Sequence, residues 1–434
     1  MSAELKPVSP SAPAPAARLP REVWVLLAAS FVIALGFGIV APAIPTFARS
    51  FHVSVTAASI VISAFAFMRL GFAPVSGKLV SALGERSVFI WGITVVGLST
   101  GACALAADYW QLLVLRALGG VGSTMFTVSA VALLIRLTPP ALRGRSTGLW
   151  SSSFLLGSVS GPLFGGGLIA ISLRAPFVVY AVSLFAAAAV AWLFLRRPAM
   201  VGNVPVVDVP ALTVRQAWRH RAYRAALASN FANGWAVYGV RVSLVPLFVV
   251  EVLHRAQALA GAALSVFAAG TMAVLMFSGR LTDSLGRRRP MLVGLVVTGA
   301  ATIWLGFTSG VPQFLAAALI AGAGTGLITP AQGATVADVV GSQAKGGPVL
   351  SVAQMTADIG AILGPIATGL LVDQLSYLAA FILTGCISLL AGVVWLRSPE
   401  TLPPKNAEPT WTRSARQRGR WPSPRSGRTP PHLA

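Results

Sequence analysis

Four ionisable side chains lie inside long apolar runs of this chain: Arg69, Arg116, Arg241 and Asp358. Charged groups inside an apolar span are costly and usually functional. Asp358 is the only acid deep within such a run, and a helical rise of 1.5 Å per residue places it about 14 Å along its helix. A carboxyl group held between an apolar environment and a nearby arginine can bind and release a proton. We therefore expect Asp358 to carry protons with Arg116 or Arg241 as its movable partner, the alternative being a fixed structural ion pair.

The three arginines differ in their expected depth. Arg241 lies toward the outer side of its run, whereas Arg69 lies about eight residues from the inner end, so we expect its side chain to extend to the water there. Three arginines against one aspartate make the interior positive. This charge balance favours an anionic or acceptor-rich substrate over a cationic one.

The elements that position these charges are apolar runs long enough to cross a membrane. Of the 434 residues, 55% are hydrophobic and 10% are charged, against about 25% charged residues in ordinary soluble domains. A span needs roughly 20 apolar residues. The composition excludes a soluble globular protein and predicts an all-α membrane protein with twelve transmembrane helices. The runs are 23–44, 55–76, 87–107, 110–135, 149–171, 176–195, 224–250, 258–278, 291–308, 312–336, 348–371 and 376–396.

Basic residues fix the expected orientation. With both termini inside, only Arg49, Arg174 and Arg255 fall in outer loops, and nearly all the other Lys and Arg lie in inner segments. This bias predicts a multi-pass protein of the plasma membrane with cytoplasmic termini, and it explains the net charge of +21 without nucleic-acid binding. The expected organisation is a disordered leader (1–21), a six-helix bundle (22–198), a cytoplasmic linker (199–222), a second bundle (223–398) and a basic, Pro-rich, disordered tail (399–434).

The two bundles repeat each other in sequence. Gly120 and Gly122 match Gly322 and Gly324, and Gly161-Pro162 matches Gly364-Pro365, at offsets of 202 and 203 residues. Other matches keep the same order with almost no drift, which indicates two pseudo-equivalent halves. The four intramembrane charges have uncharged counterparts, namely Thr271 for Arg69, Ala318 for Arg116, Val40 for Arg241 and Leu155 for Asp358. The repeated scaffold does not need these charges, so we take them as site candidates.

Four motifs carry a family resemblance. The fifth run contains G-x-x-x-G-P-x-x-G-G at Gly157, Gly161, Pro162, Gly165 and Gly166. Glycines at this spacing let a second helix approach closely, and the proline can bend the helix. The eleventh run repeats the motif loosely. The fourth run has Arg116-Ala-Leu-Gly-Gly-Val-Gly-Ser, and the first has Gly36-Phe-Gly-Ile-Val-Ala-Pro-Ala-Ile-Pro.

A loop motif precedes the ninth run, and a partial copy precedes the third. The second-half copy is complete, whereas the first-half copy has Ser81 in place of the acid and Glu85 in place of a basic residue. The residues of the two loops are Gly77, Gly84, Arg86, Gly279, Asp283, Gly286, Arg287 and Arg288. Such loops can hold an acid–base latch that closes in one conformation and releases in the other.

Over residues 22–398 the sequence resembles the major facilitator superfamily, and within it the twelve-helix drug:proton antiporters. The resemblance implies two six-helix bundles that rock around a substrate site near the midplane, a part for Arg116 in proton coupling and gating by the loops. Polar or aromatic residues in apolar helices are expected to line the cavity or to form bonds between helices: Phe37, Asn230, Asn233, Trp235, Tyr238 and Gln354.

We therefore predict proton-coupled efflux of a small amphipathic molecule or drug by alternating access. The alternatives are a facilitator or symporter for a sugar or other metabolite, and a membrane sensor or scaffold without transport. No nucleotide-binding or hydrolase motif occurs, and the two cysteines and four histidines do not form a metal-binding pattern. We expect no enzyme activity, no cofactor and no metal. The expected partners are lipid, protons and a small molecule, and the chain is expected to act as a monomer.

Overall fold

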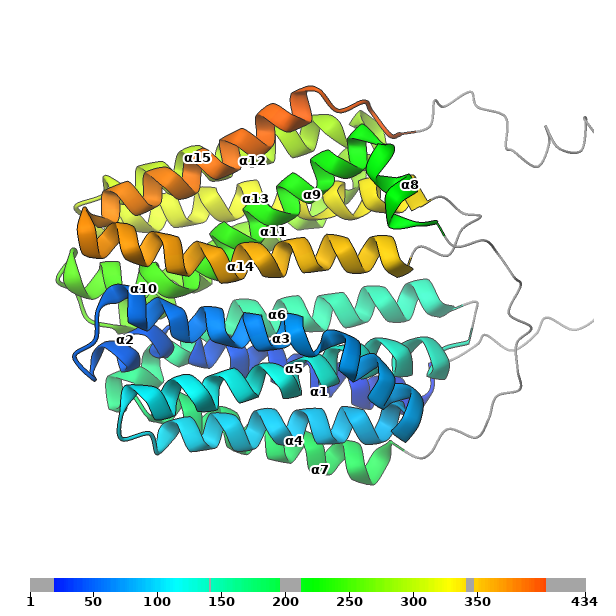
Figure 1. Ribbon diagram of the computed structural model, residues 1–434, viewed down its shortest axis with the longest axis horizontal. Helices are drawn as coiled ribbons and strands as arrows, with labels where there is room; N and C mark the ends of the chain where they lie inside the picture. The colour runs from blue at the N-terminus through cyan, green and yellow to red at the C-terminus, as the bar shows by residue number, and fades with distance from the viewer. Residues whose placement is uncertain (1–18, 140–141, 196–211, 341–346, 403–434) are drawn as a thin grey trace, which may run out of the picture.

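A computed structural model describes residues 19–139, 142–195, 212–340 and 347–402 (Figure 1). Most of the predicted leader, the first part of the linker and most of the tail lie outside the described residues. The helices are α1 Arg21–Val40, α2 Ala43–Arg49, α3 Val55–Leu83, α4 Glu85–Ala104, α5 Tyr109–Leu137, α6 Arg143–Ile171, α7 Ala175–Phe194, α8 Val214–Arg219, α9 Arg221–Asn233, the π-helical segment η2 Gly234–Val240, α10 Arg241–Glu251, α11 Ala258–Leu285, α12 Arg288–Gly306, α13 Val311–Val340, α14 Gly347–Gln374 and α15 Tyr377–Leu396.

The prediction of twelve spans is confirmed for the described part of the chain. Twelve of its helical stretches are long and apolar enough to cross a membrane; α1 with α2 forms the first, and α9, η2 and α10 together form the seventh. Several helices continue past the predicted ends, with α3 reaching Leu83 and α11 reaching Leu285. The later part of the predicted linker is helical, because Thr213 and Gln216 form a capping box that starts α8.

The two halves lie one above the other in Figure 1, with α1 to α7 below and α9 to α15 above. The repeated glycines serve the same contact in each half. A Cβ at Gly120 would overlap the Phe65 carbonyl oxygen of α3, and a Cβ at Gly322 would overlap that of Phe267 in α11. Phe65 and Phe267 are themselves 202 residues apart, so the sequence repeat is a structural repeat.

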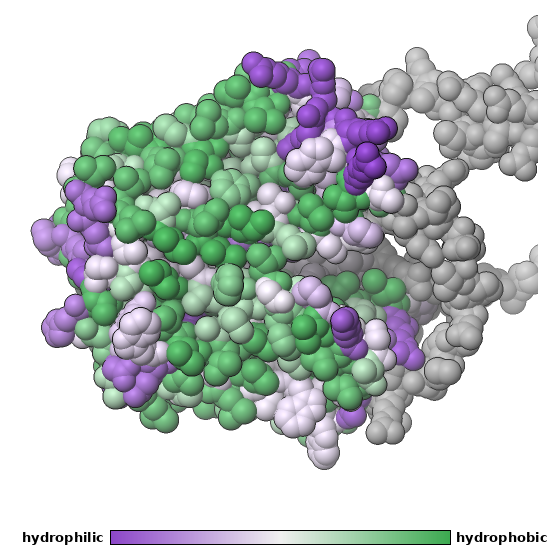
Figure 2. Space-filling model, in the orientation of Figure 1, coloured by the Kyte–Doolittle hydropathy of each residue, from purple (hydrophilic) through white to green (hydrophobic). Residues whose placement is uncertain are grey.

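The halves meet at one end of the bundle and separate at the other. We call the end where α1 begins and α15 ends the termini end, and the opposite end the distal end. At the distal end Arg49 of α2 pairs with Glu251 of α10 at 2.8 Å. Asp373 of α14 accepts bonds there from the backbone nitrogens of Val55 and Thr56, each at 2.9 Å. At the termini end the surface is recessed between the halves in Figure 2.

An apolar surface lies between these two ends of the bundle on the face shown in Figure 2. Figure 2 shows hydrophobic residues over the helices and polar residues gathered toward the two ends. Large apolar side chains such as Trp91, Phe164 and Met276 are more than half exposed, which in water would favour aggregation but in a bilayer places them against lipid chains.

Candidate functional site at the contact between the halves

An ion pair links the two halves near the middle of the bundle. Nη2 of Arg69, on α3, lies 2.8 Å from Oδ1 of Asp358, on α14, and the Asp358 side chain is 14% exposed. The amide of Gln354, one turn earlier on α14, lies 3.5 Å from the same carboxylate. Among the residues that the structure describes, the cation paired with Asp358 is therefore Arg69, which belongs to the other half.

Close helix crossings place this pair. Gly120 lets α5 approach α3, and Thr124 of α5 donates a hydrogen bond of 2.8 Å to the Arg69 carbonyl. Next to Asp358, the Ala357 carbonyl oxygen packs on Gly234 of η2 so closely that a Cβ at that glycine would overlap it. The backbones on both sides of the ion pair are thus fixed by glycine contacts.

The expected partners of Asp358 are elsewhere. Arg116 lies over the ring of Phe65 with its guanidinium carbon 4.2 Å from the ring centroid, and Arg241 lies over Phe267 at 3.7 Å. The pairing of Asp358 with Arg116 or Arg241 was therefore a wrong prediction.

The expectation for Arg69 was also wrong. It does not reach the water at the end of its helix, because α3 continues to Leu83 and the side chain turns to Asp358 instead.

The six expected cavity residues differ in their exposure and in their contacts. Tyr238 and Gln354 are exposed, and Phe37 and Asn233 are partly buried. Trp235 is buried and donates to the Thr384 hydroxyl of α15 at 3.3 Å, so it joins helices and does not line a cavity. Asn230 is partly buried and its amide bonds within its own helix.

The glycine motif of α6 forms a seam with α1. A Cβ at Gly157, Gly161 or Gly165 would come within 2.6 Å or less of a carbonyl oxygen of α1. Gly166 instead faces the other half, where its Cβ would meet the Ala258 carbonyl of α11. The motif therefore closes one bundle and also forms part of the contact between bundles.

The first-half loop keeps an ion pair despite its departure from the motif. Glu85 pairs with Arg136 at the end of α5 at 2.8 Å. At the positions 202 residues later, Arg287 pairs with Asp338 at the end of α13 at 3.0 Å. The two contacts are equivalent with their charges exchanged, which explains why an acid occupies the position of the expected basic residue.

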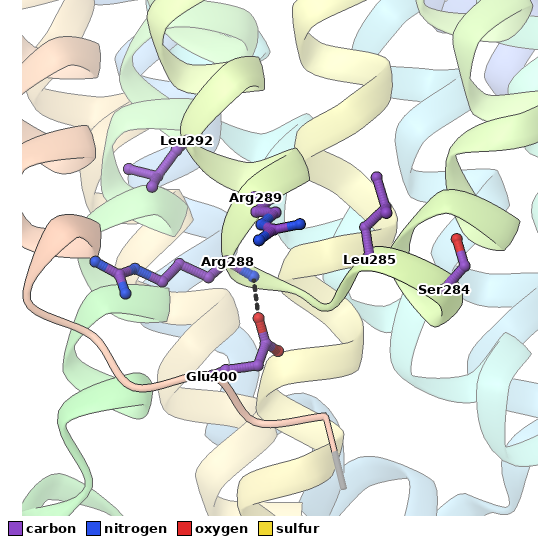
Figure 3. Close-up of a pocket in the computed structure, with 6 residues that line it drawn as sticks. All are labelled: Ser284, Leu285, Arg288, Arg289, Leu292 and Glu400. Carbon is purple, nitrogen blue, oxygen red and sulfur yellow. Dashed lines mark hydrogen bonds between the residues drawn. The ribbon is translucent and has the colours of Figure 1, made fainter. Parts of the chain in front are cut away.

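The second-half loop is held by the segment after α15. The backbone nitrogen of Arg287 donates to the Glu400 carboxylate at 2.8 Å, and that of Arg288 donates to it at 3.1 Å (Figure 3). Gly286 turns the chain there with a φ of 92°, as Gly84 does in the first half with 81°, a region that favours glycine.

The remaining loop residues do not join the halves. Asp283 is 76% exposed and lies 3.6 Å from Arg287 of its own half. Arg86 donates to the Trp192 carbonyl, which belongs to the same half as Arg86. Gly77 and Gly279 have open space around them. In this conformation the loops make no described ion pair across the termini end.

The π-helical segment η2 was not predicted from the sequence. Seven residues, Gly234–Val240, form a π-helix in the middle of the seventh span. Such segments are rare and occur frequently at functional sites. Its glycines, Gly234 and Gly239, are visible in the sequence, but glycines occur in most spans of this chain and do not by themselves indicate a π-helix.

Comparison with known proteins places this architecture in a family. The model of the Major Facilitator Superfamily matches residues 26–254 and 226–428. Multidrug resistance protein 1 of Bacillus subtilis (strain 168) is 28% identical over 174 residues, 40% of this chain and 45% of that protein. The class G tetracycline resistance protein of Vibrio anguillarum is 27% identical over 77% of this chain and 86% of its own length.

A solved structure has the same fold. The crystal structure of a bacterial homolog of the human lysosomal transporter Spinster, described as inward-facing and unoccupied, superimposes with a TM-score of 0.73 at 18% identity, and the match covers 87% of this chain and 97% of that one. The fold, the repeat and the family match agree with the resemblance found in the sequence. The chain is a secondary transporter that belongs to the Major Facilitator Superfamily.

Proposed function

We propose that this protein exports a small amphipathic molecule in exchange for protons, and that the Arg69–Asp358 pair couples the two. The supporting observation is that this ion pair, at 2.8 Å, joins residues of opposite halves. Protonation of Asp358 removes its charge and with it most of the attraction to Arg69. Because the pair lies between the halves, its loss lets them move apart, and proton release lets them approach again.

The distribution of charge supports the direction of transport that we propose. Arginines gather in the loops of the termini end, as expected for a cytoplasmic face. The recess then opens to the cytoplasm, while Arg49 and Glu251 hold the outer side closed. One proton that moves inward through a potential of 100 mV supplies about 2.3 kcal/mol. The relatives named as multidrug and tetracycline resistance proteins are consistent with efflux. Both halves belong to one chain, so a monomer suffices.

The test is transport in everted membrane vesicles with an imposed pH gradient. We expect Asp358→Asn to abolish the dependence of substrate movement on the gradient while movement down the substrate's own gradient remains. Glu22→Gln, a change of the same kind at the start of α1, should keep wild-type coupling. Wild-type coupling in Asp358→Asn would exclude this assignment. Movement of substrate in the same direction as protons would favour a symporter.

A further inference from the structure

Arg241 is a buried cation without a described counter-charge. The residue is 5% exposed, its guanidinium carbon lies 3.7 Å from the centroid of the Phe267 ring, and its Nε has no hydrogen-bond partner among the described residues. None of the described ion pairs includes it. Arginine does not lose its proton in proteins, and a buried charge is stable only when it is paired. An anion that is not part of the described chain would supply that pairing.

The other half contains a matching arrangement. Arg116 is 3% exposed, lies over the ring of Phe65 at 4.2 Å and has an unpartnered Nε. Phe65 and Phe267 occupy equivalent positions of the repeat, although their arginines come from α5 and α10, which are not equivalent. Each half thus holds one guanidinium against the phenylalanine at the equivalent position of the repeat. A ring against the face of a guanidinium leaves the N–H groups in its plane for a carboxylate or sulfonate.

The π-helical segment connects Arg241 to the proton site. Segment η2 ends at Val240, so Arg241 is the next residue. The segment lies against α14, with Gly234 on the carbonyl of Ala357 and Gly239 on the ring of Pro365. Ala357 precedes Asp358, so a shift of α14 on protonation moves the backbone that carries Arg241.

We propose that Arg241 binds the negatively charged head group of an amphipathic organic anion, that Arg116 offers a second position of the same kind in the other half, and that this anion is the transported substrate. The inference rests on the proposed function and deepens it by naming the substrate class. Phe267 and Phe65 supply apolar surface for the body of the molecule beside each charge. A cationic substrate would be repelled by the positive charge of each arginine, which has no described counter-charge.

The experiment uses three probes with one fluorophore: dansylglycine (an anion), dansylamide (neutral) and N-(2-aminoethyl)dansylamide (a cation). Each is titrated by fluorescence against the purified full chain in lipid nanodiscs. We expect the anion to bind at least about tenfold more tightly than the cation. Arg241→Gln should lose about tenfold in affinity for the anion only, and Arg241→Lys should lose less. Arg255→Gln, which removes an exposed arginine just beyond α10, should bind as wild type does.

Unchanged binding of the neutral probe shows that Arg241→Gln is folded. Equal binding of the three probes, or an equal loss for all of them in that variant, would overturn the inference. The same probes are then followed in vesicles under a pH gradient. If the anion binds through Arg241 but no probe moves with the gradient, the proposed proton coupling fails while the anion site stands. If the gradient drives the cation and not the anion, the anion site fails while the coupling stands.

Discussion

Single residues in this transporter are understood only with their partners. Glu85 is a departure from the loop motif when the sequence is considered alone, but with Arg136 it repeats the contact of Arg287 with Asp338 with the charges exchanged. The attraction between two charges does not depend on which member is positive. The altered motif therefore keeps its structural contact at the end of α5, and only the net charge of that position differs.

The four intramembrane charges could be found from the sequence, but their pairing could not. Depth along a helix follows from residue number, and it placed Asp358 near the middle of its span. Which arginine it contacts depends on the rotation and crossing of three separate helices. The close contacts at Gly120 and Gly234 determine how these helices are rotated and how they cross. The pattern of apolar residues does not show which carbonyl group a glycine contacts.

Glu400 predicts a pH dependence of stability. Partial burial raises the pKa of its carboxyl, but hydrogen bonds from the backbone nitrogens of Arg287, Leu402, Arg288 and Thr401 lower it more, so the net pKa lies below the ordinary 4.5. A lowered pKa means that the stabilisation is present above the ordinary value and is lost as the pH falls through the folded-state value. Glu400→Gln should cost no more than about 1 kcal/mol at pH 7, because the side chain is exposed and water screens its charge.

Thermal unfolding in detergent at pH 7 and at pH values below 4.5 checks this prediction. The difference in unfolding temperature between wild type and Glu400→Gln should shrink on acidification. A difference that stays constant would mean that the carboxylate charge makes no contribution to the cap.

At the scale of helices, backbone contacts at glycine determine which spans touch. Gly157, Gly161 and Gly165 bring α6 onto α1, and Gly234 and Gly360 bring the seventh span onto α14. Glycine has no side chain to separate two backbones, so these crossings are closer than those between larger residues. Close contacts of this kind also occur between the halves, where a Cβ at Gly166 of α6 would meet the Ala258 carbonyl oxygen of α11.

Hydropathy was sufficient to predict the twelve spans, because each must fill the apolar thickness of the bilayer. It could not predict η2 or α8. Segment η2 depends on the helix against which it packs, and α8 depends on a local cap at Thr213 within a segment that was expected to be a linker. The ends of α3 and α11 were underestimated, since they continue into water, where apolar composition no longer applies.

Two glycines inside membrane-spanning helices, Gly234 and Gly333, should respond differently to the same substitution. Gly234→Ala places a methyl group on the Ala357 carbonyl, so we expect a loss of about 1–3 kcal/mol in stability and slower transport. Gly333→Ala, in the last third of α13 with open space around it, should be neutral or stabilising by up to about 1 kcal/mol. Unfolding and transport rates of both variants check this, and equal effects would show that the contact at Gly234 is not tight.

At the scale of the whole molecule, the distal end is closed by a contact between equivalent positions of the repeat. Arg49 and Glu251 are 202 residues apart, the offset of the repeat, and they pair at 2.8 Å. Residues that are equivalent and also touch must lie close to the pseudo-twofold axis between the halves. Two like charges would repel there, whereas an arginine and a glutamate attract. Tyr377 donates to the same glutamate at 2.7 Å, so the contact links three helices.

Removal of this contact should favour opening of the distal end. Both side chains are about one-third exposed, so Arg49→Gln should remove no more than about 1 kcal/mol, enough to change a two-state equilibrium roughly fivefold. Spin labels on Ala107 and Ala256, exposed in distal loops of opposite halves, should report a larger population at long distance. Arg174→Gln removes a distal arginine whose bond to the Ala106 carbonyl stays within one half, and it should leave the distances unchanged. The same distances in Arg49→Gln as in wild type would mean that the other contacts between the halves, such as those of Asp373, close this end without the ion pair.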